Sequence, residues 1–380
     1  MTRAQGSHQL PSLDLLRQIT DAHVLDQLLA EPELTRAEIS ARTGISKPTI
    51  SESVRRLVLT GLLTESGQQL GRRGRAGTYF RLAEDAGVAV ALSAGPDGMV
   101  AETCDLRGAV TSRVEHDVPG TVSSVELAPI LFEAARAAVA AATGPVLAWA
   151  LSLAGPVDQR TGRLVQLPNS PFLLDELNPR TLVAPLAPAE LRVDNDVNWA
   201  ALAELHEGSA RDLRSFCYCY LGPGVGAALV ENGVLVHGHG GLAGELAHVG
   251  TEGPGGASMK LVECFAAWEL VQPGSSAIDV DRLVRLLEGQ SASDRRLTRD
   301  VARAVAGALS SVTALLNPQA VVIGGPWAEA QGFAALVAEQ LHEAAAVDAE
   351  VRTAHLDTGA PLTGARITAV RTAQQLLTRR

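Results

Sequence analysis

The chain of 380 residues is longer than one hydrophobic core usually supports, and this length predicts two or three domains. Hydrophobic residues make up 46% and charged residues 19%, which is typical of a soluble globular protein. No run of about 20 apolar residues occurs and the N-terminus lacks the apolar core of a signal peptide, so we expect a cytoplasmic protein with no membrane partner.

Net charge is unevenly distributed along the chain. Residues 1–82 contain 11 Lys and Arg against 8 Asp and Glu, whereas the remainder contains 21 against 34, so a small basic module is joined to a large acidic one. Binding of DNA phosphates needs only a local basic surface. The overall net charge of −10 therefore does not exclude a DNA-binding protein.

The four cysteines (Cys104, Cys217, Cys219 and Cys264) have no spacing typical of a disulfide framework, and we expect reduced thiols. Cys217 and Cys219 alone could suggest a metal site. They lie in a strand-like run, residues 215–220, where a period of two places both on one face. We favour this structural interpretation.

Residues 14–82 are predicted to form three helices and a hairpin. A first helical stretch, which ends near Pro32, carries an apolar stripe of Leu15, Leu16, Ile19, Val24, Leu25, Leu28 and Leu29. The second helix begins with the capping box Thr35-x-x-Glu38, and Gly44 supplies the tight turn of a helix-turn-helix. Ser46 is a good N-cap for the third helix, which tolerates Pro48 in its first turn and buries Ile50, Val54, Leu57 and Val58.

The other face of the third helix carries short hydroxyls and cations: Lys47, Thr49, Ser51, Ser53 and Arg55. A helix that enters the major groove by its N-terminus uses hydroxyls and backbone amides on phosphates and longer donors on base edges. Any one of these residues also fits a solvated helix face. The ordered series of helix, glycine turn, serine-capped helix and hairpin favours DNA binding through Lys47, Thr49, Ser51 and Arg55.

The segment 71–77 is rich in glycine and arginine and lies between two short strand-like runs. Glycine permits close backbone approach, and arginine suits the narrow, electronegative minor groove. We therefore expect a β-wing whose tip carries the DNA-binding residues Arg72, Arg73 and Arg75. A flexible basic linker is the alternative.

From Gly87 onward, strands and helices alternate. Residues 87–94, 98–105 and 109–117 predict a three-stranded meander, 124–142 a helix and 146–153 a buried strand. A second unit starts with strands at 215–221 and 227–230 and continues with helices. Two similar starts predict two α/β lobes that face a cleft.

Five sequence features, in the order in which they follow along the chain, resemble the ROK family (repressors, open reading frames, kinases) over residues from about 10 to 380. The predicted N-terminal DNA-binding module is typical of the repressors of this family. They are Ala154-Gly-Pro-Val-Asp158 with Leu167-Pro-Asn169, Val193-Asp-Asn-Asp-Val-Asn198, Leu221-Gly-Pro-Gly-Val-Gly226, Gly241-x-x-Gly244-Glu245-x-x-His248, and Leu316-Asn-Pro318 with Val321-Val-Ile-Gly-Gly325. The resemblance implies an α/β protein: an N-terminal winged helix-turn-helix (residues 1–85), then a two-lobed actin/hexokinase-like ATPase fold. Lobe 1 would span 86–196 and lobe 2 197–363, with a last helix at about 364–380 returning to lobe 1.

The polar residues of these segments suit a sugar. A hexose offers hydroxyls that both donate and accept, and amides such as those of Asn169 and Asn195 do the same. The carboxylates of Asp196, Glu245 and Glu263 accept hydroxyl protons, and His248 serves in either role. Buried carboxylates are costly unless a polar group binds them, so acids grouped on glycine-rich loops imply a polar ligand. Each residue alone could be an ordinary turn or cap.

Departures from the family's kinases argue against catalysis. The resemblance implies a D-x-G-G-T phosphate loop, but the chain reads Leu92-Ser93-Ala94-Gly95-Pro96, and the second loop, usually G-T-G-x-G, begins Gly222-Pro223-Gly224. Proline removes a backbone N–H, and phosphoryl transfer without Mg²⁺ and phosphate clamps loses most of its electrostatic stabilisation. We therefore expect no catalytic residue and no cofactor, with Asp196 acting in ligand binding.

Zinc is also not expected. The family often carries C-x-C-G-x-x-G-C-x-E after the histidine, and alignment on Glu263 puts Pro254, Gly256 and Leu261 at the cysteine positions. Cys264 is a single stray thiol. The loop should then be ordered by packing, which leaves His248 free for the sugar.

These observations predict a sugar-responsive transcriptional regulator, in particular a repressor, that binds double-stranded operator DNA as a homodimer or homotetramer. Two alternatives stay open at this point. The first is an active ROK sugar kinase with an added DNA reader, and the second is a constitutive DNA-binding protein with a vestigial pocket.

Overall fold

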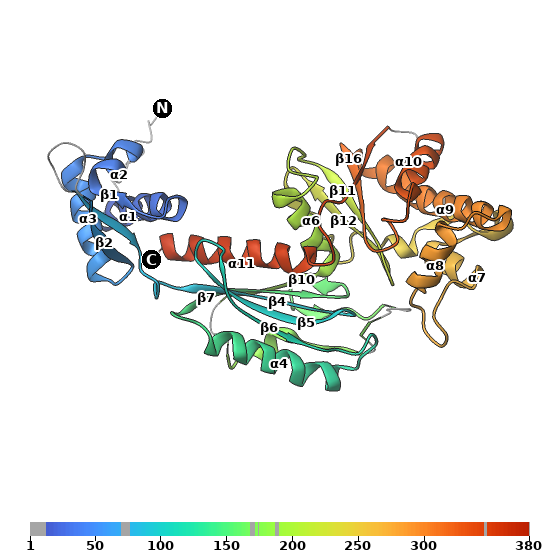
Figure 1. Ribbon diagram of the computed structural model, residues 1–380, viewed down its shortest axis with the longest axis horizontal. Helices are drawn as coiled ribbons and strands as arrows, with labels where there is room; N and C mark the ends of the chain where they lie inside the picture. Colours follow the sequence, from blue (N-terminus) through green and yellow to red (C-terminus); the bar gives the residue numbers. More distant parts are fainter. Residues whose placement is uncertain are drawn as a thin grey trace, which may run out of the picture.

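The computed structural model describes residues 13–69, 77–167, 172–173, 175–186, 190–345 and 348–379. Figure 1 shows an N-terminal domain and two lobes, each built on its own five-stranded sheet. This arrangement confirms the predicted winged helix-turn-helix followed by two α/β lobes. No helix within these ranges combines the length and the apolar character that crossing a bilayer requires.

Three helices and a three-stranded sheet of order β1-β3-β2 form the N-terminal domain. Its elements are α1 Leu13–Ala30, β1 Leu34–Thr35, α2 Arg36–Thr43, α3 Lys47–Leu59, β2 Leu63–Gln69 and β3 Gly77–Leu82. Local sequence signals set the helix ends: Thr35 and Glu38 form the expected capping box on α2, which ends at Gly44 in the left-handed conformation (φ 71°). Ser46 caps α3 as predicted.

Two predicted surfaces of this domain are wrong. Ser53, expected among the exposed hydroxyls of α3, is fully buried and its hydroxyl donates to the Asp21 carboxylate, because that face of α3 packs on α1. Leu15, Leu16 and Ile19, expected in a buried stripe of α1, are 45–48% exposed. The buried residues of α1 lie in its C-terminal half, where α3 and β3 contact it.

Lobe 1 has a sheet of order β10-β7-β4-β5-β6. Its strands are β4 Val88–Gly95, β5 Gly98–Asp105, β6 Val110–His116, β7 Val146–Leu153 and β10 Glu190–Asn195, with the short pair β8 Val157–Asp158 and β9 Arg163–Leu164 beside them. Helix α4 (Ser124–Ala140) covers one face and α11 (Ala360–Thr378) the other (Figure 1). The short helix α5 (Pro179–Val183) precedes β10.

Lobe 2 has a sheet of order β13-β12-β11-β16-β17. The strands are β11 Phe216–Leu221, β12 Val225–Glu231, β13 Val234–Leu235, β16 Ala320–Gly324 and β17 Glu350–Thr353. Helix α6 (Asp196–Glu207) covers one face. The other face is covered by α7 Leu261–Ala267, α8 Val280–Leu287, α9 Ala292–Leu316 and α10 Phe333–Ala344.

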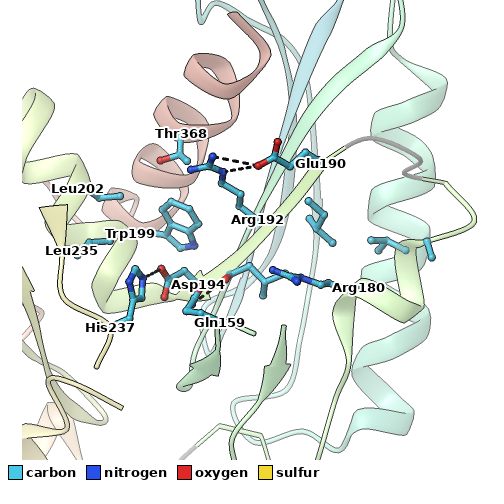
Figure 2. A pocket seen from close by; sticks show the side chains of 14 residues that line it. Gln159, Arg180, Glu190, Arg192, Asp194, Trp199, Leu202, Leu235, His237 and Thr368 are labelled. Atoms are coloured by element: carbon cyan, nitrogen blue, oxygen red, sulfur yellow. Dashed lines mark hydrogen bonds and ion pairs between the residues drawn. The ribbon is translucent and has the colours of Figure 1, made fainter. Parts of the chain in front are cut away.

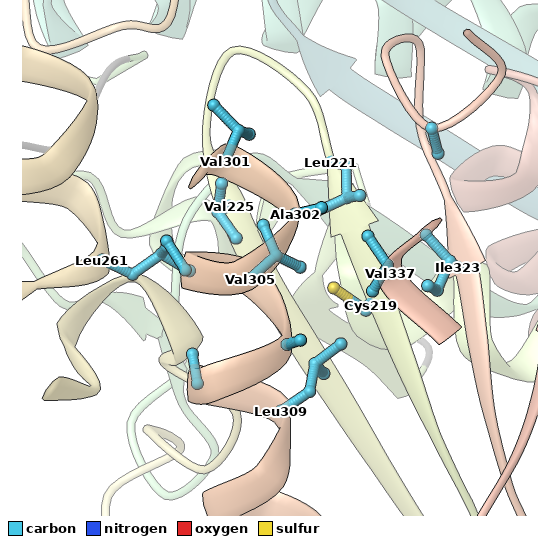
Figure 3. Close-up of a cluster of buried hydrophobic side chains, with 14 of the residues drawn as sticks. Cys219, Leu221, Val225, Leu261, Val301, Ala302, Val305, Leu309, Ile323 and Val337 are labelled. Carbon is cyan, nitrogen blue, oxygen red and sulfur yellow. The ribbon is translucent and has the colours of Figure 1, made fainter. Parts of the chain in front are cut away.

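Figure 3 shows the core between this sheet and α9. Val301, Val305 and Leu309 of α9 pack toward Cys219 and Leu221 of β11. Cys217 and Cys219 are both fully buried on this face, whereas Phe216 and Tyr218, which alternate with them along the strand, belong to the core on the opposite face. The prediction that the two cysteines share one face of a strand is confirmed.

Helix α11 joins all three parts of the molecule. It packs on β4 and β7 of lobe 1, on α6, and on α1 of the N-terminal domain. Gly364 lets α11 approach α6 closely, since a Cβ there would lie 1.9 Å from the Trp199 carbonyl oxygen. The N-terminal domain shares one hydrophobic core with lobe 1 and α11, and the Arg107 guanidinium donates to the carbonyl oxygens of Leu28, Glu31 and Pro32 at 2.7–2.9 Å. The N-terminal domain is thereby attached to lobe 1.

Candidate functional site

Helix α3 presents its N-terminus at the surface of the N-terminal domain. The Ser46 side chain accepts from the Thr49 amide at 3.4 Å, and the Ser46 and Thr49 hydroxyls are hydrogen-bonded at 2.7 Å. Lys47 and Thr49 are exposed and Ser51 is half-buried, so the start of the helix carries an exposed cation and polar groups. Such a helix end has unpaired N–H groups and a positive partial charge, both suited to phosphate.

Arg55 is exposed but already engaged. Its guanidinium donates two hydrogen bonds to Glu52, at 3.1 and 2.7 Å, and both side chains are more than half exposed. An exposed ion pair of this kind is worth little, so Arg55 can exchange Glu52 for a DNA group at small cost.

Arg56 has a structural role that the sequence did not indicate. Its guanidinium donates to the Asp21 carboxylate at 2.7 Å, and the same carboxylate accepts from Ser53. Asp21 thus ties α3 to α1 and fixes the direction in which Lys47 and Thr49 point. Each partner lies 32 or 35 residues from Asp21, a separation that local patterns cannot resolve.

Strands β2 and β3 form the two sides of the expected wing, with register from Leu63↔Leu82 to Gln69↔Gly77. Arg72, Arg73 and Arg75 lie outside the described residues, so their DNA-binding role stays a prediction.

A cavity between the two lobes collects most of the predicted sugar-binding residues, and we call it the cleft cavity. Asn195, Asp196, Glu245 and His248 all line it, together with the neighbouring Asn198 and Tyr220. Its walls come from the Ala154–Pro156 loop of lobe 1, the N-terminus of α6, the Gly224–Ala227 segment and the Gly241–His248 loop. Asn169 lies outside the described residues, and its contact with a sugar stays a prediction.

Asp196 begins α6, directly after its N-cap. The Val197 amide donates to both the Asn195 and the Asp196 side chain at 2.9 Å. These bonds and the helix N-terminus favour the carboxylate, but burial opposes it more strongly and raises the pKa of Asp196 to about 7. Burial, with the nearby charge of Asp196, also raises the pKa of Glu245 to about 7. Both residues are half-buried, and their carboxyl groups face one cavity in which they can accept hydrogen bonds from ligand hydroxyls.

Two glycines place Glu245 in the cavity. Gly244 has φ 96°, and a Cβ there would lie 1.9 Å from the Ala227 carbonyl oxygen, while the Gly244 carbonyl accepts from the Ala227 amide at 2.8 Å. Gly241 has φ 78° and approaches the Val157 carbonyl of lobe 1 equally closely. Only glycine combines this backbone conformation with such contacts, which explains the Gly-x-x-Gly spacing before Glu245.

Glu263 occupies a different place from the other predicted ligands. Its carboxylate accepts from the Lys260 amide at 3.1 Å and forms part of the cap on α7. It lines a neighbouring hollow with Val271 and Gly274, and it is not among the residues that line the cleft cavity. A residue at the third position of a helix has a ready local use for a carboxylate, and the sequence could not distinguish this use from sugar binding.

The segments that resemble kinase phosphate loops are occupied by structural hydrogen bonds. Gly222 donates its amide to the Gly224 carbonyl at 3.0 Å, and Pro223 has no amide hydrogen. The Gly222 carbonyl accepts from the Trp327 indole at 2.9 Å, and the Pro223 carbonyl from Ile278 at 2.8 Å. In lobe 1, β4 runs through Gly95 into a tight turn at Pro96 and Asp97, and Pro96 lines the cavity.

Residues 250–260 form a hairpin in place of a metal-binding loop. Strand β14 (Gly250–Glu252) pairs with β15 (Ser258–Lys260), and Cys264 is buried with its thiol 3.5 Å from the Lys260 carbonyl. Across the described ranges, no cluster of three or more His, Cys, Asp or Glu side chains could hold a metal ion.

Tyr220, Asn198 and Asp97 were not predicted from the sequence. The Tyr220 ring lies over Gly222, where a Cβ would come within 2.5 Å of it. Asn198 donates to Asp194 at 2.7 Å, and the charge of Asp97 contributes to the raised pKa of Asp196. The Gly-Pro-Gly sequence beside a tyrosine was the one signal that could have indicated an aromatic wall.

The chain matches the profile of the ROK family over residues 90–372 and that of the MarR family over residues 13–74. A xylose repressor of Caldicellulosiruptor bescii is 24% identical over 358 residues, which cover 87% of this chain and 88% of the relative. A ROK family transcriptional regulator described as a homolog of the E. coli MLC protein has a TM-score of 0.67 at 19% identity, over 96% of this chain and 97% of that one. A ROK hexokinase from Thermus thermophilus has a TM-score of 0.60 at 28% identity, over 74% of this chain and 97% of that one.

Proposed function

This chain belongs to the ROK family, and we propose that it is a sugar-responsive transcriptional repressor whose kinase-like lobes sense the sugar without phosphorylating it. The observation that carries the proposal is the convergence of Asn195, Asp196, Glu245 and His248 on one cavity, in a chain that also presents a capped helix-turn-helix. The similarity to a xylose repressor along most of both chains supports this combination.

The DNA-binding part of the proposal rests on α3. Lys47 and Thr49 stand exposed at its N-terminus, and the hairpin of β2 and β3 leads to the arginine-rich segment 71–77. We assign Lys47, Thr49, Ser51 and Arg55 to the major groove or its phosphates, and Arg72, Arg73 and Arg75 to the wing. Two copies of the chain would place two such readers on half-sites about one helical turn apart.

The sugar-binding part rests on the chemistry of the cleft cavity. Asp196 and Glu245 accept hydroxyl protons, Asn195 both donates and accepts, and His248 completes a set that can bind several hydroxyls of one ring. Asp196 belongs to α6, which packs on α11, and α11 reaches the N-terminal domain. A sugar that favours one arrangement of the lobes would therefore change the placement of the readers in a dimer.

The loss of catalysis rests on the phosphate loops. Gly222 and Pro223 have no free amide hydrogen to offer a phosphate, and the lobe 1 loop Leu92-Ser93-Ala94-Gly95-Pro96 lacks the acid of the kinases. Asp196 could still act as a base, and the 28% identity with a ROK hexokinase keeps sugar phosphorylation as the second candidate function. Incubation with ATP, Mg²⁺ and a sugar panel distinguishes them: we expect no sugar-dependent ADP release, and turnover at a kinase rate contradicts the proposal.

The direct test is a sugar panel read in two ways. A sugar that binds the folded protein raises its melting temperature, and the same sugar should release a labelled operator in a titration of DNA binding. If no pentose or hexose changes either quantity while DNA binds, the chain is a constitutive DNA-binding protein with a vestigial pocket.

A further inference from the structure

A second cavity, of about 650 Å³, lies beside β10 (Figure 2). Asp194 and Trp199 line it, whereas residues 195–198 between them line the cleft cavity. Its walls come from α5 and β10 of lobe 1, from α6 and α11, and from Leu235 and His237 of lobe 2. Small-molecule sites have volumes of roughly 300–1,000 Å³, so this space can hold a metabolite.

The acidic and basic side chains that line this cavity are not all paired with one another. Glu190 is paired with Arg192 at 3.3 Å and Asp194 with His237 at 2.6 Å, as the dashed lines in Figure 2 show. Arg180 has no ion-pair partner within the described ranges, and its Nε atom is buried without a hydrogen bond. Both carboxylates therefore already have a partner, whereas the Arg180 guanidinium has no carboxylate partner among the described residues.

The position of Arg180 depends on Gly162. A Cβ at Gly162 would lie 2.3 Å from the Arg180 Nε atom, and the glycine has φ 69°. The Arg180 side chain of α5 thus packs against the Gly162 backbone, and it lines the cavity (Figure 2). A packed guanidinium loses less entropy on binding than a free surface arginine.

The remaining wall is apolar and comes from both lobes. Val183 of α5, Leu202 of α6 and Leu235 of β13 line it. A ligand with a charged end and an apolar body would match this distribution, since the charge can reach Arg180 while the body contacts these side chains.

We infer that the second cavity binds a small organic anion, a carboxylate or a phosphate ester, through Arg180. A guanidinium binds either group through two parallel N–H donors. Arg192 can add a second cation, because its pair with Glu190 is about half exposed and readily exchanged.

This anion site is connected to the cleft cavity through Asp194. One Asp194 oxygen accepts from the Asn195 amide at 2.8 Å and from the Asn198 side chain at 2.7 Å, and both residues line the cleft cavity. The other oxygen binds His237 of lobe 2. An anion that draws His237 toward itself would loosen this link between the lobes, so the anion should change the affinity of the cleft for its ligand.

The test titrates the full chain with inorganic phosphate and, separately, with citrate, at constant ionic strength in chloride and without sugar or DNA. Calorimetry should show one site per chain for at least one anion, and the stronger of the two identifies the preferred class. Arg180→Gln should weaken binding about tenfold or more, because a charge-assisted pair is lost. Arg296→Gln, at an exposed arginine of α9, is the matched control and should bind as the native chain does.

Three outcomes overturn the inference: neither anion binds, Arg180→Gln binds normally, or both variants weaken equally. The melting temperature of each variant without anion shows whether it is folded. Because the titration omits sugar and DNA, its failure leaves the proposed regulator function untouched. Once a sugar ligand is known, its dissociation constant should change in the presence of the anion, and His237→Gln should reduce that change.

Discussion

The proposed DNA-binding face of α3 and the cleft cavity differ in how far their polar groups are exposed to solvent. Lys47, Thr49 and Arg55 are exposed to solvent, whereas Asp196 and Glu245 are enclosed between the lobes and have pKa values raised to about 7. The α3 face comes from one continuous segment, whereas the cavity is lined by separate segments that lie between Pro96 and Ile278 in the chain. Substitutions at the two sites should therefore have different effects. Those on α3 should remove contacts with DNA, whereas those in the cavity should leave enclosed polar or charged groups without partners.

The largest expected effect is the loss of the sugar response in the cavity. Replacing Asp196 or Glu245 by Ala should abolish sugar release of the operator, because each loss leaves sugar hydroxyls without partners at roughly 1–3 kcal/mol apiece. DNA affinity without sugar should stay nearly native, since these residues lie in the cleft between the lobes. Operator titrations with and without sugar measure both. If both variants keep the full response, the sugar binds elsewhere.

The next effect tests the reader. Lys47→Ala should weaken operator binding by about 1–3 kcal/mol and relax the preference at particular base pairs. Glu52→Gln should act in the opposite direction, because it leaves only one side-chain oxygen to accept from Arg55 and removes a negative charge near the phosphates. Competition with single-base operator variants measures both changes. Equal weakening on every sequence would make Lys47 a phosphate contact alone.

A third effect concerns the pH dependence of stability that Asp196 and Glu245 cause. Because their pKa values are raised, Asp196 and Glu245 bind more protons in the folded than in the unfolded state between about pH 4 and 7. Their contribution to stability therefore falls as the pH rises through this window. Asp196→Asn or Glu245→Gln should gain about 1–3 kcal/mol of unfolding free energy over the native chain between pH 5 and pH 8.

The control for this pH effect is a carboxyl group whose pKa shift has the opposite sign. The Ser123 side chain and amide lower the pKa of Glu126 in the cap of α4, so the contribution of Glu126 to stability is already complete at pH 5 and is lost only at lower pH. The stability difference between Glu126→Gln and the native chain should therefore be the same at pH 5 and pH 8. Chemical denaturation at the two pH values measures all three variants. If Asp196→Asn and Glu245→Gln behave like Glu126→Gln in this pH range, the pKa values of Asp196 and Glu245 are not raised.

The same contrast explains which parts were predictable from the sequence. Short-range signals were sufficient for the capping box at Thr35, the turn at Gly44 and the strand 146–153, which the structure places at Val146–Leu153. Short-range signals failed where a distant residue determines burial: Ser53 is buried and hydrogen-bonded to Asp21, whereas Leu15 and Ile19 are 45% exposed and not buried as the stripe had implied. Such pairings depend on how elements dock, which residue spacing does not encode.

The cleft was predictable only in part for the same reason. Asn195, Asp196, Glu245 and His248 converge as their order in the chain suggested. Glu263 does not join them, because it caps α7 instead. The link from Asp194 to His237 joins residues 43 apart, and neither residue belongs to a motif that predicts the other.

The smallest effect concerns the wing. It distinguishes residues that add affinity for any DNA from residues that recognise particular base pairs. Replacing Arg72, Arg73 and Arg75 together by Ala should weaken binding to all operators by a similar factor, because minor-groove and phosphate contacts carry little base information. Each lost phosphate contact should reduce the slope of log K against log salt by about one unit. Preference for A·T-rich flanks should also decline, since arginine favours a narrow minor groove.

Labelled operators titrated at several salt concentrations give the affinity and the slope in one experiment, and Lys47→Ala measured beside the triple variant shows whether base preference changes only in the former. If the triple variant binds with native affinity and native salt slope, residues 71–77 are a linker, and all sequence reading rests on α3.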